Sequence, residues 1–163
     1  MNEIEKVAQY MREHKLVMVT AESCTSGLIA ATLADIPGAG QLLDCAFVTY
    51  SVEAKQRCLG VSELTIMKHN LTSEAVAREM VLGALNRSRA NVAIANTGVV
   101  DDTDDEIPAG TQCFAWAFRS NSVQEGIAVT SETQRFQGDR VQIREQSAAF
   151  ALSRIPVYHA QHN

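Results

Sequence analysis

The feature that most constrains the fold is the run over residues 17–27, where a short apolar strand leads directly into a hydroxyl-rich turn and then a helix. Residues 17–20 are β-branched or apolar, and 28–33 have the pattern of a helix. A helix start leaves backbone N–H groups without intrahelical partners and carries a partial positive charge. The turn holds three hydroxyl side chains, those of Ser23, Thr25 and Ser26. They either cap the helix or lie beside donors for a phosphate, carboxylate or oxyanion.

Helix and strand patterns alternate along the rest of the chain. Helices are expected over 3–14, over 28–33, over 51–59, from 72 onward, and over 139–154 before Pro156. Strands are expected over 17–20, 45–50, 91–96, 111–119 and 124–133. The last two strands flank a polar turn at 120–122, which predicts an antiparallel hairpin. The order predicts an α/β fold: a three-layer α/β/α sandwich whose mixed sheet contains this late hairpin.

The composition is typical of one globular domain. The chain has 163 residues, of which 46% are hydrophobic and 20% charged, and no repeat or linker divides it. We therefore expect one α/β domain over 1–156, followed by a flexible tail over 157–163. His159 and His162 in this tail are spaced to share a helix face, so a metal-binding helix is the alternative to a frayed end.

Charge and cysteine usage argue against several function classes. The net charge is -5 and the basic residues are scattered, so we expect no nucleic-acid partner. No apolar run is long enough for a membrane span and residues 1–6 do not have the pattern of a signal peptide, so we expect a cytoplasmic protein without a membrane partner. The four cysteines show no C-x-x-C spacing, which favours small core residues over disulfides or zinc ligands: Cys24, Cys45, Cys58 and Cys113.

Four segments resemble, in order and spacing, the carboxy-terminal domain family of the competence/damage-inducible protein CinA. They are A-E-S-C-T-S-G at 21–27, F-V-T-Y-S-V-E-A-K at 47–55, K-H-N-L-T-S-E at 68–74 and F-Q-G-D-R at 136–140. The resemblance covers nearly the whole chain. Stand-alone members of the family are nicotinamide-nucleotide amidases. The resemblance therefore implies hydrolysis of the carboxamide of nicotinamide mononucleotide to nicotinic acid mononucleotide and ammonia.

Hydrolysis of an amide needs a nucleophile, a base and donors for the oxyanion. Within the family's motifs, Ser23 is the candidate nucleophile, Lys55 the candidate base, and Tyr50 a residue that relays or orients the proton. A Ser-Lys pair works if burial or a nearby cation lowers the lysine pKa enough to give a neutral amine. Cys24 is a rival nucleophile, because a thiolate forms more readily than an alkoxide. The alternative for Lys55 is a solvated helix residue that pairs with Glu53.

The remaining candidate site residues would contact a small-molecule substrate: Thr25, Ser26, Gly27, Thr97, Gly98 and Arg140. Arg140, at the start of the last helix, is expected to pair with the substrate phosphate; the alternative is a surface arginine. We expect no cofactor and no metal, and a homo-oligomer stays open.

Two positions depart from the family pattern. Ser26 stands where the family usually has glycine, and residues 99–110 replace a glycine- and proline-rich loop of the G-I-A-G-P type. The acidic loop, residues 101–106, holds Asp101, Asp102, Asp104, Asp105 and Glu106. These carboxylates would repel an anionic nucleotide unless a cation bridges them or the loop points into solvent. The sequence therefore supports two hypotheses: a working amidase, or a catalytically silent relative that binds a nucleotide or a protein partner.

Overall fold

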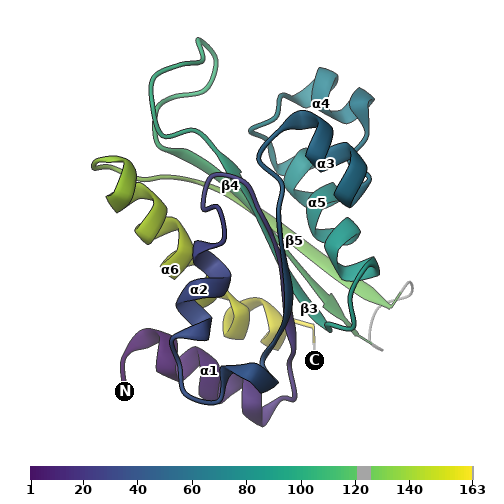
Figure 1. The fold of residues 1–163 in the computed structure, drawn as a ribbon, viewed down its shortest axis with the longest axis vertical. Helices are drawn as coiled ribbons and strands as arrows, with labels where there is room; N and C mark the ends of the chain where they lie inside the picture. Colours follow the sequence, from purple (N-terminus) through teal and green to yellow (C-terminus); the bar gives the residue numbers. More distant parts are fainter. Residues whose placement is uncertain (121–125, 163) are drawn as a thin grey trace.

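Five strands form one mixed sheet in the order β2-β1-β3-β4-β5 in the computed structural model, which describes residues 1–120 and 126–162 (Figure 1). The strands are β1 (Met18–Glu22), β2 (Leu43–Val48), β3 (Val92–Gly98), β4 (Thr111–Arg119) and β5 (Ile127–Arg135). Strand β1 pairs in parallel with β2 and β3, whereas β4 pairs in antiparallel fashion with β3 and β5. The mixed sheet and the late hairpin are confirmed, while Gln124 and residues 121–122 of the expected turn lie outside the described residues.

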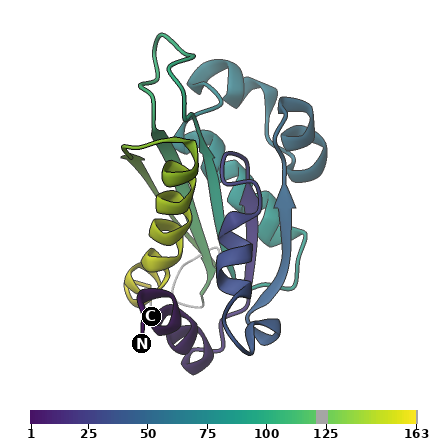
Figure 2. The same cartoon turned by 60° about the vertical axis from the view of Figure 1, so that its left-hand side comes forward.

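Helices cover both faces of the sheet, which confirms the three-layer arrangement (Figures 1 and 2). One layer holds α1 (Glu3–Glu13), α2 (Leu28–Ala34) and α6 (Arg140–Ala160), and the other holds α3 (Val52–Leu59), α4 (Glu63–His69) and α5 (Glu74–Asn86). A short 3-10 helix, η1 (Ala39–Gln41), precedes β2. Each layer buries a separate apolar cluster against the sheet.

Strand β4 shows how side-chain size shapes the two layers. Phe114, Trp116 and Phe118 point to the α1/α2/α6 face, while Ala115 and Ala117 point to the α5 face. The small side chains let α5 lie close to the sheet. On its other side, α5 packs closely against α3. A Cβ on Gly83 of α5 would lie 2.0 Å from the Leu59 carbonyl oxygen, so this crossing requires glycine.

The prediction for the carboxyl end of the chain is wrong: α6 does not stop before Pro156 but continues to Ala160. Ile155 and His159 are buried, and Tyr10 of α1 hydrogen bonds to His159 Nδ1 at 2.8 Å. Burial of this last turn against α1 and the sheet offsets the backbone hydrogen bond that Pro156 cannot donate. Helix α4 was not expected either; its apolar residues Leu64 and Met67 are exposed, and only Ile66 packs, partly buried, against the core.

The cysteines lie in or beside the core, as small apolar residues do. Cys24 and Cys113 are buried, Cys45 and Cys58 are half-buried, and all four are free thiols. Within residues 1–120 and 126–162, no helix is both long enough and apolar enough to cross a bilayer.

Candidate active site

The candidate site lies where the parallel strands end. Strands β1, β2 and β3 point the same way, and β1 lies between the other two, so the chain leaves β1 at a point where the strand order reverses. Ligands of open α/β sheets bind in the crevice beyond such strand ends. A cavity of about 250 Å³ opens at this edge. Five of the predicted site residues line it: Ser23, Tyr50, Lys55, Thr97 and Gly98.

Lys55 lies against Ser23 at the base of this cavity. Its Nζ is 3.0 Å from Ser23 Oγ, 2.8 Å from the Thr49 carbonyl oxygen and 3.1 Å from the Tyr50 carbonyl oxygen. Ser51 caps α3 by accepting the Ala54 N–H, and this cap turns the helix so that Lys55 points back toward the sheet. The lysine side chain is only 2% exposed, which excludes the alternative of a solvated lysine paired with Glu53.

Burial lowers the pKa of Lys55 from its ordinary 10.5 to about 8. Its three polar partners are a hydroxyl and two carbonyl groups, none of which carries a charge that would hold the proton. A neutral amine fits this set, because its two N–H groups can donate to the carbonyls of Thr49 and Tyr50 while its lone pair accepts the Ser23 hydroxyl proton. The geometry is therefore suited to a general base beside a nucleophile.

The turn after β1 is held by Glu22. Its carboxylate accepts hydrogen bonds from the backbone N–H groups of Gly27, Ile29 and Ala30 and from the Thr25 hydroxyl. In this structure the backbone N–H groups at the start of α2 therefore donate to a side chain of the protein. Thr25, Ser26 and Gly27, which were expected to contact substrate, do not line the cavity. Ser26 is exposed and adopts a left-handed φ of 50°. Glycine adopts this conformation more easily, because it has no Cβ atom.

A network of polar side chains holds Cys24, the residue after Ser23, and the neighbouring Thr25. The Asn96 side chain accepts the Thr25 N–H and donates to Gln112, whose own amide donates to Cys24 Sγ at 3.4 Å. Arg144 donates to the carbonyl oxygens of Cys24 and Thr25. Burial raises the pKa of the Cys24 thiol, which disfavours the thiolate that a rival nucleophile would need.

Sequence reasoning missed the four polar residues of this network: Glu22, Asn96, Gln112 and Arg144. Glu22 and Asn96 gave one usable signal, since Glu22 is the polar last residue of β1 and Asn96 is the first polar residue of β3. Gln112 and Arg144 gave none, because their partners come from distant parts of the chain.

Thr97, Gly98 and Tyr50 border the cavity in different ways. The Thr97 hydroxyl donates to the Leu71 carbonyl oxygen, so it ties β3 to the segment before α5. A Cβ on Gly98 would lie 2.2 Å from Gln112 Oε1, so a side chain there would displace the amide that contacts Cys24. The Tyr50 residue is 61% exposed at the rim, and its contact with Lys55 is made by its carbonyl oxygen.

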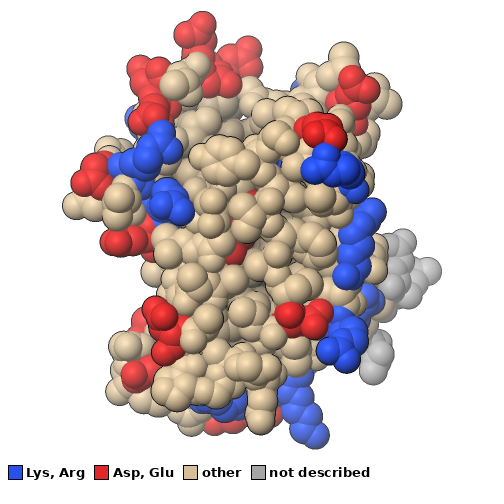
Figure 3. Space-filling view, viewed as in Figure 1, with Lys and Arg blue, Asp and Glu red and all other residues tan. Residues whose placement is uncertain are grey.

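The acidic loop joins β3 to β4 and projects beyond the ends of these strands (Figure 1). Figure 3 shows acidic side chains gathered there. Arg140 is exposed, forms an ion pair with Asp101 of this loop and does not line the cavity. Asp104 does line the cavity. The Glu106 backbone N–H and the Asn70 side-chain amide, 3.1 Å away, lower the pKa of the Asp104 carboxyl. A negative charge therefore lies in the same cavity as Ser23 and Lys55.

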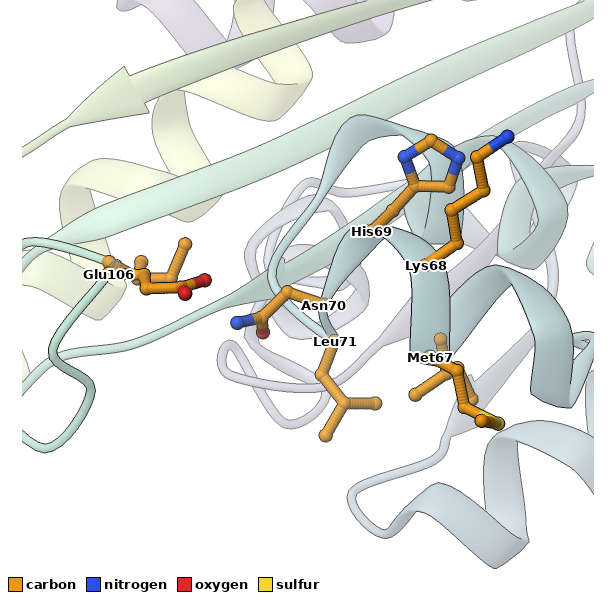
Figure 4. Close-up of a pocket in the computed structure, with 8 residues that line it drawn as sticks. Met67, Lys68, His69, Asn70, Leu71 and Glu106 are labelled. Carbon is orange, nitrogen blue, oxygen red and sulfur yellow. The ribbon is translucent and has the colours of Figure 1, made fainter.

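A second cavity of about 510 Å³ adjoins the first between the end of α4 and the acidic loop (Figure 4). Asn70 and Leu71 line both cavities. Figure 4 shows Asn70 and Glu106 on opposite sides of the gap, while Lys68 extends away from it. The two cavities together give room for an amide that carries a large second group.

Comparison with known proteins shows which family the chain belongs to. The family model for the CinA C-terminal domain matches residues 2–158. The chain belongs to the CinA C-terminal domain family. A CinA-family protein of Klebsiella pneumoniae, the competence damage-inducible protein A, has a crystal structure that superposes with a TM-score of 0.90 at 32% identity, covering 99% of this chain and 97% of that one.

Two relatives of the CinA family differ in length. The nicotinamide-nucleotide amidohydrolase PncC of Escherichia coli K12 is 39% identical over 153 residues, which are 93% of this chain and 89% of that protein. A putative competence-damage inducible protein of Symbiobacterium thermophilum is 40% identical over 158 residues. The match covers 94% of this chain but only 37% of that longer protein.

Proposed function

We propose that this protein is an amide hydrolase that cleaves the carboxamide of a nicotinamide nucleotide, with Ser23 as nucleophile and Lys55 as base. The observation that carries the proposal is the contact of 3.0 Å between Lys55 Nζ and Ser23 Oγ inside a cavity at the strand ends. The similarity to PncC of Escherichia coli, over 93% of this chain, supports the reaction class.

The first half-reaction forms an ester. Neutral Lys55 takes the Ser23 hydroxyl proton while Ser23 Oγ attacks the carboxamide carbon, which gives a tetrahedral intermediate with a negative oxygen. Lys55 is then an ammonium group whose charge stabilises that oxygen at short range. The C–N bond breaks, the lysine proton passes to the leaving nitrogen, and ammonia departs.

The second half-reaction restores the enzyme. Neutral Lys55 takes a proton from water while the water oxygen attacks the ester carbon, and the ester C–O bond breaks as Ser23 Oγ recovers a proton from Lys55. The product is the carboxylic acid. The carbonyl groups of Thr49 and Tyr50 hold the amine in place throughout, and the Tyr50 side chain, at the rim, is the proposed residue that orients the substrate or relays a proton.

A second candidate is a catalytically silent relative that binds a nucleotide or a protein partner. It is favoured by the acidic loop, because Asp101 pairs with the arginine expected to bind phosphate and Asp104 lies in the cavity. A phosphate near these carboxylates would be repelled. On the amidase proposal, Arg140 must exchange Asp101 for the substrate phosphate.

Ammonia release measured over a panel of amides distinguishes the two candidates. The panel starts with nicotinamide mononucleotide and includes its nucleoside and free nicotinamide. The amidase proposal predicts turnover of at least one of these amides by the wild-type protein and by Cys24→Ala, and loss of nearly all turnover in Ser23→Ala with binding retained. Wild-type protein that binds nicotinamide mononucleotide but releases no ammonia from any amide would support the silent relative.

A further inference from the structure

We propose that Glu22 is the positioning residue that holds Ser23 against Lys55, an inference that rests on the proposed function of that pair. Glu22 is fully buried at the end of β1, immediately before Ser23. Its two carboxylate oxygens accept five hydrogen bonds of 2.7 to 3.1 Å. The donors are the hydroxyls of Thr20 and Thr25 and the backbone N–H groups of Gly27, Ile29 and Ala30.

The backbone donors call for an acceptor at both side-chain oxygens. An ionised carboxylate only accepts hydrogen bonds, and each of its oxygens accepts at least one backbone N–H here, so the NH2 group of an amide in either position would face an N–H hydrogen. The three backbone donors lie at the N-cap and in the first turn of α2, where N–H groups lack partners within the helix. The carboxylate therefore binds the start of α2 to the end of β1 and closes the turn that carries Ser23.

The same residue also reaches the other half of the pair. The Glu22 carbonyl oxygen accepts the Thr49 N–H at 2.9 Å, and the Thr49 carbonyl oxygen accepts a hydrogen bond from Lys55 Nζ at 2.8 Å. Ser23 follows Glu22 directly in the chain. The Glu22 side chain thus holds the turn that carries Ser23, and the Glu22 backbone holds Thr49, whose carbonyl oxygen binds Lys55. The distance between nucleophile and base depends on both contacts.

The test compares Glu22→Gln with Glu132→Gln. Glu132 accepts hydrogen bonds from Tyr158 and Gln134, but it lies on the edge strand β5, three strands away from β1. A displacement of about 1 Å in a reacting group can cost 10²-fold in rate. We expect Glu22→Gln to lower kcat for ammonia release about 100-fold with KM within about threefold, and Glu132→Gln to leave both unchanged.

Two readouts do not depend on amide turnover. Hydrogen exchange at the Gly27, Ile29 and Ala30 amides should speed up in Glu22→Gln while exchange in β4 stays slow, which shows a folded protein with an open turn. Labelling of Ser23 by a fluorophosphonate should slow about as much as kcat does. If the wild-type protein hydrolyses no amide, the proposed function fails, and these two readouts still decide the role of Glu22.

Thr25→Val is the milder variant in case Glu22→Gln does not fold. It removes one of the five donors with little change of shape, and we expect a smaller loss of kcat, about tenfold or less, again with KM unchanged. The proposal is overturned if folded Glu22→Gln, or folded Thr25→Val where the first variant does not fold, retains wild-type kcat and wild-type Ser23 labelling. It is equally overturned if KM rises while kcat stays constant.

Discussion

Replacing Lys55 by methionine should change how stability depends on pH. The folded protein holds this lysine at a pKa of about 8 against an ordinary value of 10.5, because burial disfavours the charged form. Between these two pH values the unfolded chain binds the extra proton, so the stability of the wild-type protein rises with pH. The slope is about 1.4 kcal/mol per pH unit, and the full effect is roughly 3 kcal/mol.

The assay is urea unfolding of wild-type protein and Lys55→Met at pH 7, 8, 9 and 9.5. Methionine leaves the Thr49 and Tyr50 carbonyl groups without their donor, but that cost does not vary with pH and only offsets the two curves. Between pH 8 and 9.5, we expect the free energy of unfolding of the wild-type protein to rise by about 2 kcal/mol relative to that of the variant. Lys68→Met, which removes an exposed lysine, controls for the general loss of one charge. A difference that stays constant across this range would refute the reasoning.

Three further predictions concern other parts of the molecule. Ser26→Gly should raise the free energy of unfolding by about 1 kcal/mol, because it relieves a left-handed φ without removing a buried side chain; urea unfolding that shows a loss would contradict this. Burial lowers the pKa of His159, so the unfolded chain binds the extra proton below pH 6.5 and the melting temperature should fall there, less steeply in His159→Gln; identical slopes would speak against it. Replacing residues 101–106 by a neutral glycine-rich loop should tighten binding of nicotinamide mononucleotide in calorimetry, with a gain that shrinks as salt rises; a gain independent of salt would rule out repulsion.

Much of the fold could be predicted because its signals are local. The strand and turn before α2, the apolar runs of β2 and β3 and the β4–β5 hairpin are visible in short windows. The last turn of α6 could not be predicted, because Pro156 is a local stop signal while the burial of His159 against Tyr10 depends on the first helix. Helix α4 was not expected because it is only seven residues long and none of them is fully buried.

The site could be predicted only in part, and for the same reason. Ser23 and Lys55 belong to segments whose order resembles a family, and the structure brings their side chains together. Glu22 reads in the sequence as the polar end of a strand, yet it fills the helix start that was expected to bind an anion. Asp101 likewise forms an ion pair with Arg140. No local pattern could show this pair, because the two residues are 39 positions apart.

The pH dependence of kcat for ammonia release from nicotinamide mononucleotide tests the central claim most directly. If Lys55 must be neutral to take the Ser23 proton, kcat rises about tenfold per pH unit below pH 8 and levels off above a pKa near the value of about 8 that burial gives the lysine. Lys55→Arg should be inactive at every pH, because a guanidinium keeps its proton. A kcat that does not change between pH 6 and 9, or an active arginine variant, would contradict the account.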